Sequence, residues 1–226
     1  EIRDPNFSYR IIFIPETIGS ITYLSSNYKE MKKKIFVGFN VSCVGDDRAY
    51  SYLPSRNGKT ISDLIAKHVL KWIDPNFVEY NWLNRGSDER QYCAPGIDLP
   101  IASILRTKYG AYPEYHTSLD NLENVVTPKG LEGGYWAIRK AIEAIERNKN
   151  YKTTVLCEPQ MGKRDLYPTL SIRNENKKVN LMMNFISFCD GKSSLLEIAE
   201  RLNMPIWDLY GLIDELYSHD LIHSDE

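Results

Sequence analysis

The chain has 226 residues, enough for one large domain or for one domain joined to a small second one. Apolar residues make up 42% and charged residues 26%, the balance of a globular protein, which excludes a fibrous or disordered chain. The formal net charge of −2 excludes a strongly basic nucleic-acid-binding protein, and no apolar run approaches the roughly 18 residues of a membrane helix.

The start of the chain and its cysteines do not indicate export. Residues 1–6 lack the basic and apolar regions of a signal peptide, and the first residue is not Met, so we expect a chain processed or cut from something longer. The cysteines form no close pair of the kind found in zinc knuckles. We therefore expect reduced, largely buried thiols in a cytoplasmic protein. These cysteines are Cys43, Cys93, Cys157 and Cys189.

Two continuous apolar runs in the first fifty residues predict buried strands. Tyr9–Ile14 is stopped by a proline, and Ile35–Val44 ends in a Gly-Asp-Asp turn. Between them we expect a helix from about Ser20 to Asn27, because the serine hydroxyl can cap free N–H groups.

The middle of the chain alternates helical and strand patterns. Apolar residues from Ile61 to Ile73 recur at helical spacing, and short strands are expected at Val78–Leu83 and Pro100–Leu105. A long helix is expected to begin at Thr127-Pro128. Residues 1–150 therefore predict an α/β domain with a mainly parallel sheet sandwiched by helices.

The last third of the chain has a different character. Residues 151–178 are rich in charges, with two prolines and no clean periodicity, and are interpreted as a linker or arm. Residues 179–226 show helical patterns at Leu181–Phe188, Ser194–Leu202 and Pro205–Tyr217, which predict a small winged-helix-type module.

The charge of this module argues against nucleic acid as its partner. Residues 179–226 carry two basic and nine acidic side chains, which gives 2 − 9 = −7. DNA binding draws most of its affinity from basic side chains on phosphates, so we expect a protein partner instead. The apolar residues between Ile206 and Leu216 exceed one buried stripe, and some are expected to face a partner or the main domain.

Acidic residues and one histidine follow the predicted strands. In parallel sheets, functional residues gather beyond the carboxyl ends of the strands, and mixed nitrogen and oxygen ligands suit zinc. The same residues could equally form an ordinary polar rim with turn and capping roles. Nearby arginines either anchor a substrate carboxylate or phosphate or form salt bridges that order the loops. The acidic residues and histidine are Glu16, Asp46, Asp47, Asp88, Glu89 and His116, and the arginines are Arg48, Arg85, Arg90 and Arg106.

Several motifs resemble those of co-catalytic zinc aminopeptidases and glutaminyl cyclases. His116-Thr-Ser-Leu-Asp120 resembles their HT-x-x-D segment, and Gly86-Ser-Asp-Glu89 resembles their Ser-Asp-His segment with Glu in place of His. Ile14–Ser20 resembles a shortened Glu-Glu…Gly-Ser segment. Longer stretches resemble a bacterial branch of this superfamily that is encoded with surface-polysaccharide genes and ends in a winged-helix module. These stretches are VGDDRAYSYLPSR, RGSDERQYCAPGIDLP and YPEYHTSLDNL.

The resemblance implies a zinc-dependent hydrolase acting on a peptide-like or amide-containing small substrate, of which this chain is the C-terminal half. It implies Glu16 as general base or zinc ligand, His116 as a ligand, and Asp46 as a further ligand, with Asp47 as the alternative to Asp46. The remaining site residues are expected to bind substrate or support the ligands. The alternative is a related protein that has lost the chemistry and acts as a binding or assembly partner in polysaccharide biosynthesis. The supporting residues are Asp47, Asp88, Glu89, Arg90 and Asp120.

Overall fold

The structure, a computed structural model, describes residues 4–164, 166 and 173–224 of the chain. Two compact units are present, Glu1–Glu143 and Ala144–Glu226. Part of the arm expected at residues 151–178 lies outside the described residues.

A four-stranded sheet forms the centre of the first unit. Its order is β1 (Gly38–Val41), β4 (Ile101–Leu105), β2 (Ser51–Leu53) and β3 (Val78–Glu79). The β1–β4 and β2–β3 pairs are parallel and the β2–β4 pair is antiparallel. The prediction of a mainly parallel sheet is therefore confirmed, with one antiparallel pairing in its middle.

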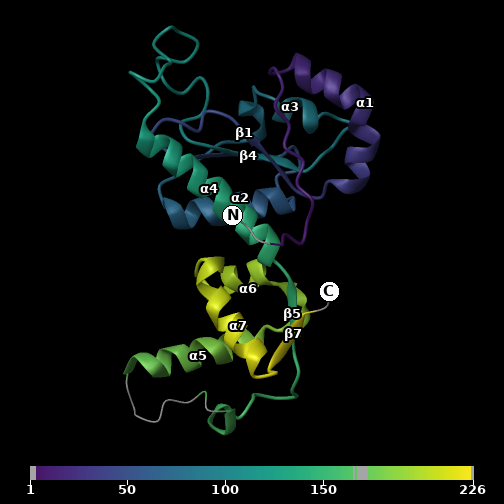
Figure 1. Ribbon diagram of the computed structural model, residues 1–226, viewed down its shortest axis with the longest axis vertical. Coiled ribbons are helices and arrows are strands. Elements are labelled where there is room, and N and C mark those ends of the chain that lie inside the picture. The colour runs from purple at the N-terminus through teal and green to yellow at the C-terminus, as the bar shows by residue number, and fades with distance from the viewer. Residues whose placement is uncertain (1–3, 165, 167–172, 225–226) are drawn as a thin grey trace. The chain divides into compact units, whose positions relative to one another are not determined.

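Helices cover both faces of this sheet. Figure 1 shows α1 (Ile18–Lys34) and α3 (Glu89–Tyr92) on one side, and α2 (Ile61–Ile73) and α4 (Pro128–Arg147) on the other. All five residues of β4 are buried, as expected for a central strand covered on both faces. A 3₁₀ turn at Trp82–Asn84 connects β3 to the segment before α3.

Local signals in the sequence set the ends of the helices. Thr60 and Asp63 form a capping box at the start of α2, each side chain accepting a backbone hydrogen bond from the other residue. Lys32, Lys33 and Lys34 occupy the last turn of α1, where positive charge favours the negative end of the helix dipole.

The expected strand at Tyr9–Ile14 is wrong, because the structure places this segment in no helix or strand. Ile12 and Ile14 pack against the core beside α1, whereas Ile11 and Phe13 are 76% and 93% exposed. The segment has the alternating burial of a strand but no strand partner among the described residues. An apolar run in the sequence indicates that a segment packs against a core, but it does not show whether a neighbouring strand is available for pairing.

Other predicted boundaries shift because turn and capping interactions outside the apolar run set them. The first helix extends to Lys34, beyond the expected Asn27. The strand expected at Val78–Leu83 ends at Glu79, where Asn81 caps the following 3₁₀ turn through a hydrogen bond from the Leu83 amide.

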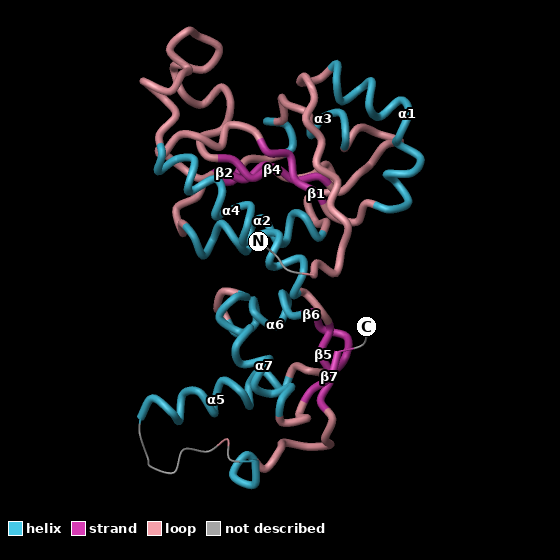
Figure 2. Tube along the Cα trace, in the orientation of Figure 1, coloured by secondary structure: helices cyan, strands magenta, loops and turns pink. Residues whose placement is uncertain are grey.

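The second unit combines helices with a three-stranded antiparallel sheet of order β6-β5-β7, as Figure 2 shows. Asp190-Gly191, between two predicted helices, forms the start of a strand, and a 3₁₀ turn precedes α7. The elements are β5 (Asn150–Thr153), a 3₁₀ turn (Met161–Arg164), α5 (Arg173–Ser187), β6 (Asp190–Ser194), α6 (Leu195–Leu202), a second 3₁₀ turn (Ile206–Leu209), α7 (Tyr210–Ser218) and β7 (Ile222–Ser224).

Most of the apolar residues of 206–216 form the core of this unit. Trp207 and Tyr210 are half-buried, and the others are at most 7% exposed. The five buried residues therefore face the core of their own unit, and Trp207 and Tyr210 are the ones that stay partly exposed. The buried residues are Ile206, Leu209, Leu212, Ile213 and Leu216.

Candidate functional site

Asp46 and Asp47 lie in the segment after β1, and His116 and Asp120 lie in the segment after β4. Glu16 instead precedes α1, Asp88 precedes α3, and Glu89 is the first residue of α3. The strands β1 and β4 are parallel neighbours, so the segments that follow them leave the sheet at the same edge. The segment after β1 packs closely against α4, because Gly130 and Gly134 of this helix face the backbone of the segment. A Cβ at Gly130 would lie 2.0 Å from the Gly45 carbonyl oxygen, and one at Gly134 would lie 2.5 Å from that of Val44. Only glycine permits this approach.

The Glu16 loop and the Asp88 loop are in direct contact. The Thr17 amide donates to Asp88 Oδ1 at 2.7 Å, and Arg90 Nη2 donates to Thr17 Oγ1 at 2.7 Å. These bonds hold the turn before α1, where Thr17 has a φ of 63°. Glu16 itself is exposed. Asp88 and Arg90 therefore fix the backbone that presents the Glu16 carboxylate.

Glu89 is a fully buried carboxylate that ties several segments together. Its Oε1 accepts from the amides of Gly86 at 2.8 Å and Ser87 at 3.0 Å and from the Tyr109 hydroxyl at 2.7 Å, and its Oε2 accepts from Asn40 Nδ2 at 3.0 Å. Burial, and then the bond to Glu89, raise the pKa of Tyr109, so this phenol stays protonated and keeps donating. Both oxygens of Glu89 are engaged in organising the site.

His116 and Glu16 lie near the same tyrosine. The His116 ring stacks on Tyr115 with centroids 4.0 Å apart, and the histidine is exposed with a φ of 61°. Burial raises the pKa of Tyr115, and the negative charge of Glu16 raises it further. His116 therefore contacts Tyr115 directly, and the charge of Glu16 acts on the same phenol.

Asp120 joins this cluster through Tyr112. The Tyr112 hydroxyl donates to Asp120 Oδ2 at 2.8 Å and lies 3.9 Å from the sulfur of Cys43, just beyond β1. Burial, and then the bond to Asp120, raise the pKa of Tyr112. Burial also raises the pKa of the Cys43 thiol, which keeps it protonated at neutral pH.

Asp46 and Asp47 have different surroundings. Asp46 is 3% exposed, and its carboxylate accepts from the Arg48 amide at 3.0 Å and from the Thr107 amide at 2.8 Å. The Thr107 hydroxyl donates to it as well. Asp47 is exposed. The carboxylate of Asp46 thus joins the loop after β1 to the loop after β4.

The arginines near these loops make internal contacts. Arg48 forms a bidentate ion pair with Glu114 at 2.8 and 2.9 Å. Arg106 is buried, donates through Nε to the Asp46 carbonyl at 2.7 Å, and stacks over the Tyr50 ring. Both arginines order loops. This is the second of the two roles expected from the sequence, the first being to anchor a substrate carboxylate or phosphate.

Lys108 is a site residue that the sequence did not single out. It follows β4 by three residues, donates to the Tyr109 carbonyl at 3.1 Å, and lies over the rings of Tyr80 and Tyr109. Burial lowers its pKa, and the charge of Glu89 partly offsets this. Its position after a buried strand is the only signal that could have identified it.

A catalytic zinc site needs three protein ligands that converge on one point. Among the residues that the structure describes, no three His, Cys, Asp or Glu side chains converge in a way that could hold a metal ion. The oxygens of Asp46 and Glu89 already accept hydrogen bonds. The donors that this chain brings together do not, as arranged, fit a zinc ion.

The fold and the strand-end loops define an aminopeptidase-like α/β protein with a winged-helix module. The family model of a domain of unknown function, DUF4910, matches residues 1–148, and that of a winged helix-turn-helix matches residues 149–224. The chain belongs to the DUF4910 family.

Known relatives agree with this assignment. A protein of Clostridium acetobutylicum named "Putative polysaccharide biosynthesis protein with aminopeptidase-like domain" is 37% identical over 218 residues, which are 96% of this chain and 50% of the relative. A crystal structure of a "putative peptidase" from Clostridium acetobutylicum has a TM-score of 0.82 and 35% identity, and covers 93% of this chain and 47% of that one. The chain thus spans about half the length of these relatives.

A zinc aminopeptidase from Bacillus subtilis is a more distant structural neighbour. It has a TM-score of 0.45 and 16% identity, with 57% of this chain and 32% of that chain covered. A similarity at this level carries no argument about the site. No helix in the described part of the chain is long and apolar enough to cross a membrane.

Proposed function

We propose that this chain is the ligand-binding half of an aminopeptidase-like hydrolase that acts on a peptide-like or amide-containing small molecule. Hydrolysis of the amide bond then depends on zinc ligands from the half of the domain that this chain does not span. The observation that carries the proposal is the cluster that follows β4, where His116 stacks on Tyr115 and Tyr112 donates to Asp120, with the charge of Glu16 acting to raise the pKa of Tyr115.

The chemistry of this cluster suits a ligand with an amino group. An exposed carboxylate such as Glu16 attracts a cationic amine, and the rings of Tyr112 and Tyr115, 5.6 Å apart, offer an apolar surface for the rest of the molecule. The exposed His116 can hold or move a proton near such a ligand. These are binding and positioning roles that the chain can perform with its own residues.

The test compares metal content and hydrolysis in two proteins. Elemental analysis is performed on this chain, on its His116→Ala variant and on the full-length Clostridium relative, and each is assayed with aminoacyl p-nitroanilides. We expect far less than stoichiometric zinc in the chain, unchanged in His116→Ala, and both zinc and hydrolysis in the relative. Near-stoichiometric zinc in the chain that disappears in His116→Ala would overturn the assignment of the missing ligands to the other half.

A second candidate function is binding or assembly in polysaccharide biosynthesis without catalysis. It is supported by the carboxylates of Asp46 and Glu89, which are engaged in hydrogen bonds, and by the name of the relative. This function would be favoured over hydrolysis if the full-length relative contains no zinc and hydrolyses no substrate but still binds ligands with an amino group.

The second unit has its own proposed role in binding a protein. Two ion pairs, Arg147–Asp214 and Lys178–Glu215, join acidic residues of α7 to basic residues far away in the sequence. The helix α7 itself contains no basic residue and stays acidic. A winged helix is a fold that can bind DNA, but residues 179–226 of this unit carry a net charge of 2 − 9 = −7, which DNA phosphates repel. A basic protein surface is the partner that its charge favours.

A further inference from the structure

The strand β1 forms one edge of the four-stranded sheet. Among the described residues it pairs only with β4, so its other side has no strand partner. Proteins protect exposed edges with charged residues, prolines or bulges. The sequence of β1 is Gly38-Phe-Asn-Val41, which contains neither a charge nor a proline. This edge is therefore suited to pairing with another strand.

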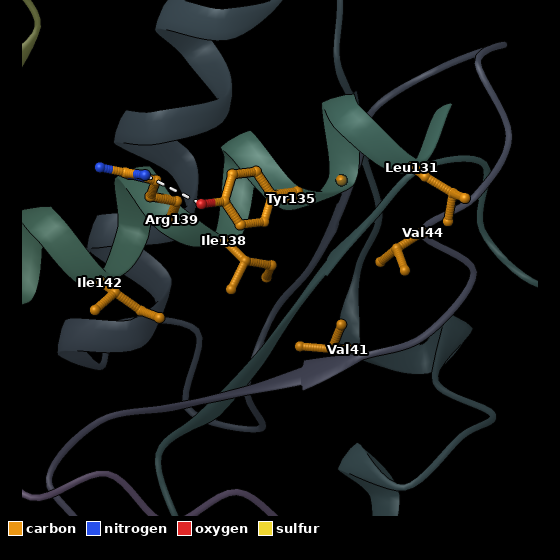
Figure 3. A pocket seen from close by; sticks show the side chains of 8 residues that line it. Val41, Val44, Leu131, Tyr135, Ile138, Arg139 and Ile142 are labelled. Carbon is orange, nitrogen blue, oxygen red and sulfur yellow. Dashed lines mark hydrogen bonds between the residues drawn. The ribbon is translucent and has the colours of Figure 1, made fainter. Parts of the chain in front are cut away.

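An apolar groove of about 450 Å³ lies beside this edge, between the end of β1 and α4. Figure 3 shows Val41 and Val44 on the strand side facing the side chains of α4. Arg139 lies at the groove but is occupied, since it pairs with Glu143 at 2.9 Å and donates to the Tyr135 hydroxyl at 3.0 Å. The α4 residues that line the groove are Leu131, Gly134, Tyr135, Ile138, Arg139 and Ile142.

The helix α4 has a second apolar face that its own unit does not bury. Ala137 and Ala141 are fully buried, as a helix that packs on a sheet requires. In contrast, Leu131 and Tyr135 on the groove side are 50% and 56% exposed, and Val41 across the groove is 52% exposed. Contiguous exposed apolar residues of this kind mark an interface.

The N-terminal segment adds apolar surface near the same edge. The Phe7 ring lies 4.9 Å from that of Phe36, two residues before β1, so the segment passes close to this strand. Ile11 and Phe13 in the extended stretch that follows are 76% and 93% exposed. Neither this strand-like segment nor the outer side of β1 is paired with a strand among the described residues.

The length of the relatives indicates what covers this surface. The chain aligns over 96% of its own length with only 50% of the Clostridium protein, which leaves a second half of similar size. A sheet with parallel strands is normally covered on both faces and needs its edges paired or protected. A second half of one α/β domain supplies strands for the edge and apolar side chains for the groove.

We propose that the free edge of β1 and the groove lined by α4 form the docking surface for the other half of the aminopeptidase-like domain. A strand of that half pairs with Gly38–Val41, and its apolar side chains fill the groove between Val41 and Ile138. This inference concerns assembly of the domain and does not depend on whether the assembled domain is a hydrolase.

Amide hydrogen exchange tests the pairing directly. Exchange is measured by mass spectrometry in this chain and in the full-length Clostridium relative, at the segment Gly38–Val41 and at its counterpart. We expect exchange at least about tenfold slower in the relative, because a new partner strand protects the outer amides of β1. The other edge strand, Val78–Glu79, is the internal control and should exchange similarly in both. Equal exchange at the β1 segment would overturn the proposal.

A binding experiment tests the groove. Tagged chain is co-expressed with the half of the Clostridium relative that it does not match, and the amount co-purified is measured. Val41→Lys and Leu131→Asp should reduce recovery at least about tenfold, whereas Leu64→Asp, on the exposed side of α2, should not. Thermal melting checks that each variant is folded, and all three positions are about half exposed.

Other occupants would give different results. Sedimentation should find this chain monomeric, and a dimer with protected β1 amides would identify a second copy as the occupant and overturn the proposal. Failure of the wild-type chain to recover the other half, or equal recovery with the groove variants, would also overturn it. None of these readouts measures hydrolysis, so this proposal and the proposed function can fail separately.

Discussion

Individual side chains at the candidate site divide into those that present chemistry and those that hold the loops. Glu16 and His116 are exposed, whereas Asp46 and Glu89 are buried and hydrogen-bonded. Residue type alone does not distinguish these roles, because an Asp after a strand suits a metal and a loop amide equally well. Burial and hydrogen-bond partners make the distinction.

Replacing Asp46 by Ala should destabilise the fold. The change would leave the buried amide and hydroxyl of Thr107 without their acceptor, at a cost of about 2–4 kcal/mol in the free energy of unfolding. Urea denaturation followed by circular dichroism measures it. Asp47→Ala at the exposed neighbour is the matched control and should change stability by less than about 0.5 kcal/mol. Equal stability of the two variants would contradict the structural role of Asp46.

Whole elements depend on similar buried networks. Asp63, in the first turn of α2, is fully buried and accepts from Tyr52, Ser55 and Thr60, which lie on β2 and the loop between β2 and α2. One carboxylate thus caps the helix and joins it to the sheet. Both the capping interaction and the contact with Tyr52 are seen in the tertiary fold.

The stability of this helix–sheet connection should depend on pH. Burial acts to raise the pKa of Asp63, but hydrogen bonds from Ser55, Thr60 and Tyr52 outweigh it, and the pKa is lowered in the folded protein. A carboxyl with a lowered folded pKa stabilises the fold above its unfolded pKa of about 3.9, and this stabilisation is lost as the pH falls through the folded pKa.

Urea denaturation between pH 7 and pH 3 measures this dependence. Asp63→Asn should be less stable than wild type at pH 7 by about 2 kcal/mol and should lose less stability in acid. Glu123→Gln, at an exposed site, is the control and should follow the wild-type curve. Parallel curves for wild type and Asp63→Asn would rule out Asp63 as a source of the acid sensitivity.

At the scale of the whole molecule, the fold of the second unit and the charge of its C-terminal part favour different partners. A winged helix-turn-helix model matches residues 149–224, whose net charge is 9 − 10 = −1. The acidity is concentrated toward the C-terminus, where residues 179–226 carry two basic and nine acidic side chains. The fold by itself suggests DNA, whereas the acidity of residues 179–226 favours a different partner.

We expect no binding of the chain to double-stranded DNA at 0.15 M salt. Fluorescence anisotropy with a labelled duplex of mixed sequence should give no change up to about 100 µM protein, weaker than typical nonspecific binding. A basic winged-helix domain is the positive control. Saturable binding that weakens with added salt would contradict the proposed protein-binding role.

Much of the first unit could be predicted from local patterns. The apolar residues between Ile61 and Ile73 predict α2 within its observed bounds, and Thr127-Pro128 marks the start of α4. The short strand Ser51–Leu53 could not be predicted, because three residues do not establish a period. Its antiparallel pairing with β4 is a long-range contact that leaves no local signal.

The sequence by itself determined the α/β class, the winged-helix module and its acidity, because these depend on short-range periodicity and on composition. It also identified the strand-end loops as the place where polar residues gather. Only the tertiary structure decided that Asp46 and Glu89 are used within the fold, and that β1 and α4 leave an apolar edge uncovered. The reason is physical: hydrogen-bond partners and burial are set by residues far away in sequence, which neither periodicity nor spacing reports.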